Sequence, residues 1–536
     1  MISERLEPTH GARADSSPNV IVILADDLGY SDLGCFGGEI RTPTLDKLAH
    51  QGVRMTSFYN TARCSPSRAS LLTGQHPHRT GIGILTDDDR PHGYPGSLRT
   101  DVATIAELFK QSGYETALAG KWHLSHDVST PNITWPTRRG FDDFYGILAG
   151  ADSYFNPQGL HHNEERVRVT DPDFYLTDAI SDHAADFVSR SRARRSPFFL
   201  YLAYTAPHWP LHAPEAEIDA YLDTYRSGWD DLREQRLDRL IQEGLLPSNM
   251  PLSRRDSSQP GWSETPHKGW NVRRMATYAA QVTRMDAGIA TVLDALGDDA
   301  ENTLVLFLSD NGASAEPMPP PGATNFATRQ PSRTRAGKPI SIGNSPQVSP
   351  GGEDTYSTYG TAWANVSNAP FRLYKEWVHE GGISTPLIAS WPAGLGNSPR
   401  IVAEPFQLTD IVPTLIDATG LPPHDGPGQS MLSSWRAETT SHDAPLFWEH
   451  LGNCAVRVGP WKLIRSGFGD WALYDMRKDR TEEHDRASDF PEQVAQMAAL
   501  WQEWADANGV VPWEKIEPHL AYTPRLEPAL DSSSEW

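Results

Sequence analysis

The stretch from Cys64 to Gly74 carries the residue types best suited to chemistry. It reads Cys-Ser-Pro-Ser-Arg-Ala-Ser-Leu-Leu-Thr-Gly, so a proline follows Cys64 by two residues and Arg68 follows it by four. One interpretation is a structural thiol beside a turn proline. The other is a reactive centre, in which a group made from Cys64 acts as a nucleophile.

Two acidic pairs could hold a metal ion. Asp26 and Asp27 follow the apolar run 19–25, and Asp310 and Asn311 follow the apolar run 303–308. Adjacent ionised carboxylates in a partly buried place are costly without a counter-charge, which a divalent cation supplies. Oxygen-only ligands suit Ca²⁺ in preference to Mg²⁺. Each pair alone is also explained by capping and turn chemistry, but together with Cys64 we favour a metal site.

Three further segments supply basic groups. Lys121 and His123 offer a fixed charge and a titratable base two residues apart, which share a face in an extended chain. His208 lies in a short loop between two prolines. Lys375 lies on a predicted helix, where a lone lysine normally faces solvent.

These residues together resemble the type I sulfatases of the alkaline phosphatase superfamily, in particular bacterial arylsulfatases. The family motif Cys-x-Pro-x-Arg-x-x-x-Leu-Thr-Gly is matched at every fixed position from Cys64, and the resemblance runs from about residue 19 into the C-terminal region. In that family a formylglycine-generating enzyme oxidises the cysteine to formylglycine. One hydroxyl of the hydrated aldehyde attacks sulfur and the other expels sulfate, whereas a thiolate would be left as a stable adduct.

The resemblance also implies a role for each candidate residue. The metal, usually calcium, would lie among Asp26, Asp27, Asp310, Asn311 and the modified Cys64. Arg68 would secure the formylglycine hydroxyl, and Lys121 and Lys375 would bind sulfate oxygens. His123 would hold the diol and assist its collapse, and His208 would protonate the leaving oxygen. One departure is Ser384, which stands where the family often has arginine.

The expected function is hydrolysis of aryl or carbohydrate sulfate monoesters to alcohol and inorganic sulfate. The alternative is a phosphodiesterase or phosphonate monoester hydrolase on the same scaffold. A third interpretation is a binding protein with an unconverted Cys64. A serine hydrolase is disfavoured because no Gly-x-Ser-x-Gly motif occurs.

The substrate pocket is expected to draw on residues that the motif does not include. We predict contributions from the loop 314–368 and from Asp152, His161, His162 and Trp209. The loop is rich in Pro, Gly, Ser and Thr and shows no periodicity. A loop of this length within a domain is usually functional or mobile, so we interpret it as a substrate-side lid, with a disordered insertion as the alternative. Tyr154, Phe155 and Trp363 could stack on a sugar or an aryl ring.

Strands alternating with helices must position these groups. Strands are predicted at 19–25, 114–119, 197–204 and 303–308, and helices at 44–51, 105–109, 176–190 and 275–296. This alternation predicts an α/β fold with a large mixed, mostly parallel sheet flanked by helices. The resemblance implies that this fold is like that of alkaline phosphatase. In such sheets ligands gather at the carboxyl ends of the strands, where three of the polar clusters fall. Short strands and a helix at 491–505 predict a smaller α+β subdomain with a short antiparallel sheet.

Composition limits the domains and partners. The 536 residues are divided into a disordered arm at 1–17, a catalytic domain at 18–430 and a C-terminal subdomain at 431–536. A net charge of −22 disfavours nucleic acid, and any sulfate site must carry its own positive charge. Three cysteines make no disulfide framework, and no apolar run suits a signal peptide or a membrane span. We therefore expect a cytoplasmic protein without a membrane partner.

Overall fold

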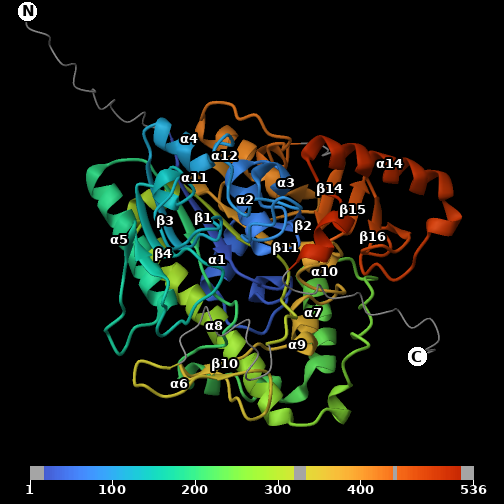
Figure 1. Cartoon of the computed structure of the whole chain (residues 1–536), viewed down its shortest axis with the longest axis horizontal. Helices are drawn as coiled ribbons and strands as arrows, with labels where there is room; N and C mark the ends of the chain where they lie inside the picture. Colours follow the sequence, from blue (N-terminus) through green and yellow to red (C-terminus); the bar gives the residue numbers. More distant parts are fainter. Residues whose placement is uncertain (1–16, 319–332, 439–443, 521–536) are drawn as a thin grey trace, which may run out of the picture.

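A large mixed sheet runs through the molecule (Figure 1). The computed structural model describes residues 17–318, 333–438 and 444–520. Within these residues the strand order is β12-β2-β11-β8-β1-β7-β3-β4-β5-β6, with β13 beside β2. The strands are β1 (Asn19–Ala25), β2 (Val53–Tyr59), β3 (Glu115–Lys121), β4 (Asp143–Ile147), β5 (Leu160–His162), β6 (Glu165–Arg166), β7 (Phe198–Ala203), β8 (Thr303–Ser309), β11 (Ser384–Ser390), β12 (Arg400–Val402) and β13 (Phe406–Gln407).

The central strands are apolar because both of their faces are covered. All seven residues of β1 are buried. Val20 and Leu24 belong to one hydrophobic core, whereas Ile21 and Ile23 belong to a second core on the opposite face. Alternate side chains of a strand point to opposite faces, so a continuous apolar run feeds two cores at once.

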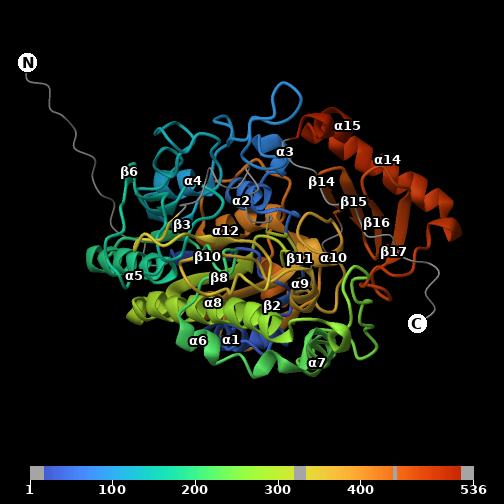
Figure 2. The ribbon, with the colours of Figure 1, turned by 60° about the horizontal axis from the view of Figure 1, so that its bottom comes forward.

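Helices form a layer on each face of the sheet (Figure 2). One layer contains α1 (Pro43–Gln51), α5 (Leu176–Arg194), α6 (Glu215–Asp219), α7 (Trp229–Gln242) and α8 (Lys268–Asp294). The other contains α2 (Cys64–Thr73), α3 (Pro77–Thr80), α4 (Ile105–Gln111), α11 (Pro392–Leu395), α12 (Ile411–Thr419) and α13 (Leu432–Trp435). The predicted α/β class and flanked sheet are therefore confirmed.

Strand direction brings the carboxyl ends of β1, β2, β3, β7 and β8 to one edge of the sheet. β1 pairs in parallel with both β7 and β8, and β3 pairs in parallel with β7. β11 is antiparallel to both β8 and β2, so β2 points the same way as β8. The segments that follow β1, β2, β3, β7 and β8 consequently emerge on the same side, where open α/β sheets bind ligands.

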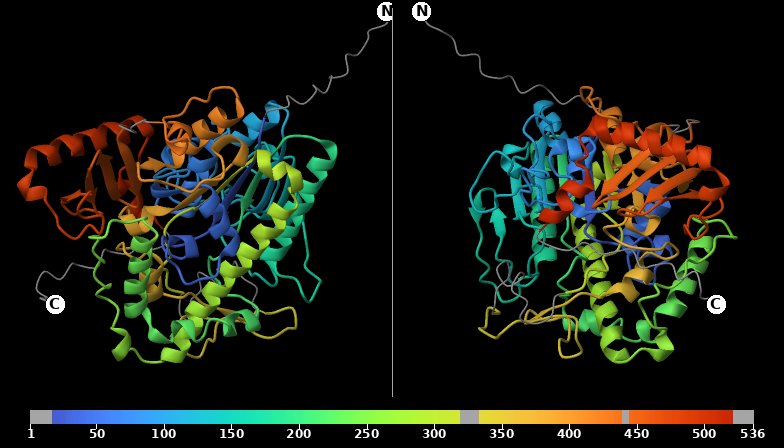
Figure 3. Two further views of the ribbon diagram at one scale, coloured as in Figure 1. Left: turned by 180° about the vertical axis from the view of Figure 1, so that it is seen from behind. Right: turned by 45° about the vertical axis from the view of Figure 1, so that its right-hand side comes forward.

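A second, smaller sheet lies beside the large one (Figure 3). Its antiparallel strands are β14 (Leu446–His450), β15 (Asn453–Val458), β16 (Trp461–Arg465) and β17 (Trp471–Asp475). Helix α14 (Pro491–Asn508) covers it through Met497, Trp501 and Trp504, and the short α15 (Trp513–Ile516) follows. Trp435 of α13 instead packs into a core of the large sheet. No helix in the described parts of the chain has the length and apolar character needed to cross a bilayer.

The predicted lid at 314–368 is only partly a loop. Residues 319–332, like residues 1–16 of the predicted arm, lie outside the described ranges. The remainder includes β9 (Ser341–Ile342), β10 (Thr355–Tyr356) and the helix α9 (Thr361–Ser367). Trp363 of α9 is fully buried and packs edge-on against Tyr225 and Trp229. The prediction that Trp363 stacks on substrate is therefore wrong, because its ring belongs to the core.

Candidate active site

The carboxyl edge of the large sheet brings together the polar groups singled out in the sequence. Ala25 of β1 pairs with Ser309 of β8, so the following residues, Asp26 and Asp310, lie next to each other. Lys121 is the last residue of β3, and Cys64 begins α2 a short turn after β2. The loop that follows β7 carries His208 to the same place.

Buried oxygen atoms converge between β1 and β8. Asp27, held at a φ of 67°, accepts a 2.7 Å bond from the Asn311 amide and donates its own N–H to Asp310. Asp26 Oδ1 and Asn311 Oδ1 are buried without a hydrogen-bond partner among the described residues. Buried oxygens of this kind need a partner, and carboxylate and amide oxygens are the donors that a hard cation accepts. The residues present therefore fit a Ca²⁺-type ion.

Each of the three carboxylates is paired with a buried cation. Arg68 donates two hydrogen bonds to Asp310 Oδ2, from Nε at 3.1 Å and from Nη2 at 2.7 Å. Lys121 Nζ lies 2.6 Å from Asp26 Oδ2, and Lys375 Nζ lies 3.0 Å from Asp27 Oδ2. Burial opposes the charge on Lys375, but Asp27 and Glu316 raise its pKa above the usual range. Formal charges cancel in this set, so a bound dication would give the site the net positive charge that an anionic ester requires.

Cys64 lies against His123 within this shell. Its Sγ is 3.5 Å from His123 Nδ1, and the thiol is buried. Burial raises the pKa of the Cys64 thiol, although Lys121 and Lys375 oppose the shift. His123 has a φ of 55°, so the segment from Lys121 is not extended as predicted. Gly150 packs so closely that a Cβ there would lie 2.7 Å from the His123 ring.

His208 lies beside Asp27 in the same group. Its Nδ1 lies 2.7 Å from the carbonyl oxygen of Trp209, so this nitrogen is the donor, and Nε2 faces Asp27 Oδ2 at 3.5 Å. Burial lowers the pKa of His208 to about 3, despite the opposing charge of Asp27. The free ring is therefore neutral at neutral pH and presents Nε2 toward the space beside Asp27.

Lys375 differs from its predicted setting. It lies in an irregular segment between α9 and α10 (Glu380–Ile383), and only 2% of it is exposed. The helix predicted around it is wrong, because Leu373 and Glu376 have positive φ values that no helix allows. The alternative interpretation, that Lys375 faces solvent, is also wrong, because its ammonium group points into the site.

Glu316 was missed by the sequence reasoning. Its Oε2 accepts bonds from Lys375 Nζ at 3.1 Å and from Trp209 Nε1 at 3.0 Å. Its Oε1 lies 2.8 Å from Arg63 Nη2. The only signal in the sequence was its position shortly after Asn311, in a segment without periodicity.

The predicted pocket residues lie in several different settings. Trp209 adjoins His208 and, with Asp27 and Ser314, lines a small cavity. Asp152 caps its own loop by accepting backbone N–H bonds from Ser153, Gln158 and Gly159. Two aromatic residues of this region pack inside the protein: Tyr154 and Phe155 both contact Tyr175. Tyr154 is buried and bonded through its hydroxyl to the backbone, so the prediction that it stacks on substrate is wrong.

The structure does not bring His162 to the site. His162 faces Asp143, at the start of β4, whereas Lys121 lies level with Ile147 at the other end of that strand. Four strand residues span about 13 Å. His161, the neighbouring residue, turns its ring toward Trp135 and bonds to the carbonyl of Gly159.

Comparisons with known proteins agree on one family. The sulfatase family model matches residues 18–421. An uncharacterised sulfatase of Schizosaccharomyces pombe is 32% identical over 540 residues, which cover 92% of this chain and 94% of that protein. An arylsulfatase of Klebsiella aerogenes is 35% identical over 433 residues, 77% of this chain and 89% of the relative. A structure of a protein with its substrate, D-glucosamine-2-N,6-O-disulfate, shares the fold with a TM-score of 0.62 at 20% identity, covering 95% of this chain and 100% of that one.

Proposed function

Because this chain belongs to the sulfatase family and hydrolyses sulfate esters, we propose that it does so through a formylglycine made from Cys64. The hydrated aldehyde supplies one hydroxyl that attacks sulfur and a second through which sulfate is released. The observation that carries the proposal is the setting of Cys64. Its side chain is 3.5 Å from a histidine and interacts electrostatically with the cations of Arg68, Lys121 and Lys375.

We propose Ca²⁺ as the resident ion. Asp26, Asp27, Asp310 and Asn311 would hold it, and it would polarise a sulfate oxygen and offset negative charge. The two unpartnered oxygens, Asp26 Oδ1 and Asn311 Oδ1, support this assignment. Mg²⁺ fits less well because it favours a small octahedral shell with several waters.

The protein groups then divide the remaining work. The ammonium group of Lys121 contacts Asp26 and that of Lys375 contacts Asp27, so both would hold sulfate oxygens in line for attack. Arg68 is fixed by Asp310 and by the carbonyl of Lys121, so it would orient the residue at position 64 without moving. His123 Nδ1 is the base closest to that residue and would take a proton from its hydroxyl.

His208 would act on the leaving-group side. Its Nδ1–H is committed to the Trp209 carbonyl, so Nε2 is the atom free to carry a proton toward the ester oxygen. Burial holds its pKa at about 3 in the free site. The negative charge of a bound sulfate ester would raise that pKa, because an adjacent anion favours the charged ring.

A paired-substrate assay tests the proposal. Converted, Ca²⁺-loaded enzyme should release sulfate from an aryl sulfate and from sulfated sugars faster than it cleaves an aryl phosphate diester. Cys64→Ala should lower sulfate release by several orders of magnitude. Cys454→Ala is the matched control, because that thiol is also buried but packs in the small sheet. Comparable hydrolysis by Cys64→Ala, or a preference for the diester, would overturn the proposal.

We also propose that Cys64 is converted by a formylglycine-generating enzyme in the cytoplasm. The three thiols are separate and form no disulfide within the described residues, which suits a reducing compartment. Production with and without a co-expressed converting enzyme tests this step. Activity should rise with the converting enzyme, and equal activity in a host without one would contradict it.

A further inference from the structure

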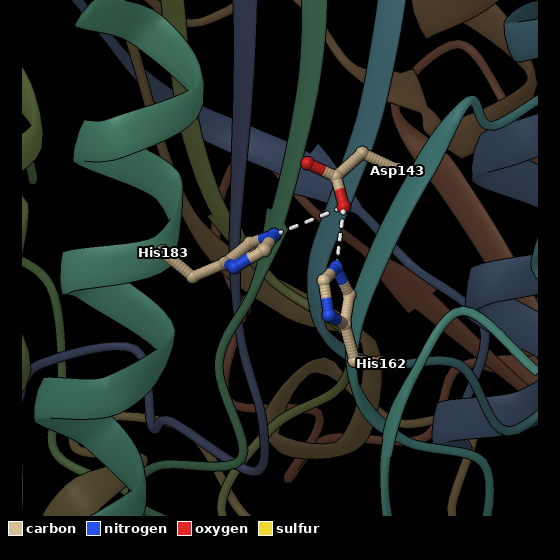
Figure 4. Close-up of side chains that lie close together, drawn as sticks. All are labelled: Asp143, His162 and His183. Atoms are coloured by element: carbon tan, nitrogen blue, oxygen red, sulfur yellow. Dashed lines mark hydrogen bonds and ion pairs between the residues drawn. The ribbon is translucent and has the colours of Figure 1, made fainter. Parts of the chain in front are cut away.

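A second group of metal-type ligands lies at the outer edge of the large sheet (Figure 4). Asp143 begins β4, His162 ends β5, and His183 lies on α5. The Nε2 atoms of the two histidines lie 3.3 and 3.2 Å from the same oxygen, Asp143 Oδ1. All the candidate ligand atoms of this group lie within 4.8 Å of one another.

The sheet and helix register produces this convergence. His162 is paired with Tyr145, and Asp143 is two residues from Tyr145, so both side chains emerge on one face of the sheet. Helix α5 covers that face and brings His183 over it (Figure 4). Two neighbouring strands and the helix that follows them therefore direct two imidazoles and a carboxylate to one point.

The spacing matches a coordination shell. Ligands bound to Zn²⁺ at about 2.0–2.1 Å in a tetrahedron are about 3.3 Å apart, close to the two nitrogen-to-oxygen distances. Two imidazoles with one carboxylate are the donors preferred by Zn²⁺ and related ions, rather than by Ca²⁺. His162 is 52% exposed, so water can reach a fourth position.

Neighbouring groups fix the orientation of the ligands. Arg190, two turns beyond His183 on α5, donates a 2.7 Å bond to Asp143 Oδ2 and leaves Oδ1 for the histidines. The ring of Tyr145 stacks on His183 at 4.8 Å between centroids. Such outer contacts pre-orient metal ligands in known sites.

We propose that Asp143, His162 and His183 form a second metal site that takes Zn²⁺, separate from the Cys64 centre. The ion would join the β5–β6 hairpin, the last strands of the sheet, to helix α5. Residues 151–159 connect that hairpin to Gly150, which packs on the His123 ring. The ion would therefore also restrain one wall of the active site.

Cobalt provides a spectroscopic test on the full-length protein with Ca²⁺ in excess. One equivalent of Co²⁺ should give the visible absorption of a four-coordinate ion, and Zn²⁺ should displace it. His162→Ala and His183→Gln should each weaken binding by about tenfold or more and remove the absorption. His126→Ala, which removes an exposed histidine elsewhere, should leave both unchanged.

Thermal unfolding gives an independent readout. Zn²⁺ should raise the melting temperature of the wild type and of His126→Ala, but not that of His162→Ala. Because His162 is largely exposed, its alanine variant is expected to fold, and sulfatase activity with Ca²⁺ checks this. Absence of the visible absorption in the wild type, or equal binding by wild type and the double variant His162→Ala/His183→Gln, would overturn the second site without affecting the proposed chemistry at Cys64.

Discussion

Glu316 accepts a 3.1 Å bond from the ammonium group of Lys375, a lysine proposed to bind sulfate. Although burial opposes ionisation, Lys375 and Arg63 hold the pKa of Glu316 well below its usual range, so the carboxylate is charged. An anionic substrate must therefore compete with Glu316 for the same lysine. Glu316 therefore weakens the binding of any anion that is not positioned to replace it at Lys375.

Replacing Glu316 should tighten anion binding. Glu316→Gln keeps the shape and removes the charge, so the inhibition constant of inorganic sulfate should fall by about tenfold, which corresponds to about 1.4 kcal/mol. Inhibition kinetics with sulfate measure this directly. Glu353→Gln, a change beside Arg335 in the segment between β9 and β10, is the control. An unchanged or higher inhibition constant in Glu316→Gln would contradict the competition.

Removal of the metal should lower activity and stability together. A chelator leaves Asp26, Asp27 and Asp310 buried close to one another, and their mutual repulsion is then offset only by the lysines and Arg68. We expect activity to fall by about a hundredfold or more, and to return with Ca²⁺ more fully than with Mg²⁺. Activity assays and thermal melts on the same chelated sample measure both effects.

Asn311→Ala removes one proposed ligand of that ion, together with the amide hydrogen bond to Asp27 Oδ1. It removes the unpartnered Oδ1 and leaves the three carboxylates in place, so Ca²⁺ affinity should fall while the protein still folds. Calorimetric titration of chelated protein with Ca²⁺ gives the affinity. Equal Ca²⁺ affinity in Asn311→Ala and wild type would show that this amide is not a ligand.

His123 should affect the chemical step more than binding. Because its Nδ1 faces the residue at position 64, His123→Ala should lower kcat by about a hundredfold to ten-thousandfold with little change in KM. Steady-state kinetics on a converted preparation separate the two constants. A rise in KM at constant kcat would instead assign His123 to substrate binding.

Stability should fall in acid through His212. This buried ring donates Nε2–H to the Thr355 carbonyl at 2.7 Å, and its Nδ1 accepts the Tyr154 N–H. Burial lowers the pKa of His212 from 6.5 to about 4, although the Thr355 bond opposes the shift. The unfolded chain therefore binds the proton first, so this contribution is complete above pH 6.5 and is lost as the pH falls from 6.5 to about 4.

His212→Gln tests the acid effect. The variant is less stable than the wild type at every pH. Between pH 6.5 and about 4, however, the free energy of unfolding of the wild type should fall by about 3 kcal/mol more than that of the variant. Urea unfolding at a series of pH values gives both curves. Parallel curves would show that His212 does not titrate between the folded and unfolded states.

The polar residues that follow parallel strands could be predicted because topology alone brings them together. Asp26 and Asp310 were placed by the ends of two apolar runs, and the pairing of Ala25 with Ser309 puts them side by side. Periodicity likewise predicted both long helices, but α5 ends four residues beyond the predicted Arg190 and α8 begins at Lys268, seven residues before the predicted Met275. Cys64 could be predicted from its motif, because the motif fixes the spacing between the cysteine and the residues that identify it.

Residues placed by irregular backbone could not be predicted in this way. Lys375 reaches the site through a segment with positive φ values, and Glu316 meets it from another segment without periodicity. Trp363 looked like a loop aromatic because Pro and Gly surround α9, yet packing buries it completely. The Asp143, His162 and His183 group depends on the pairing of β4 with β5 and on the position of α5, for which no local spacing gives a signal.

The mass of the peptide that contains Cys64 tests the central claim most directly. Conversion of the thiol to the aldehyde lowers that mass by about 18 Da. Across preparations with different degrees of conversion, sulfatase activity should rise in proportion to the converted fraction and vanish when that fraction is zero. An unmodified thiol at position 64 in fully active enzyme would contradict the account.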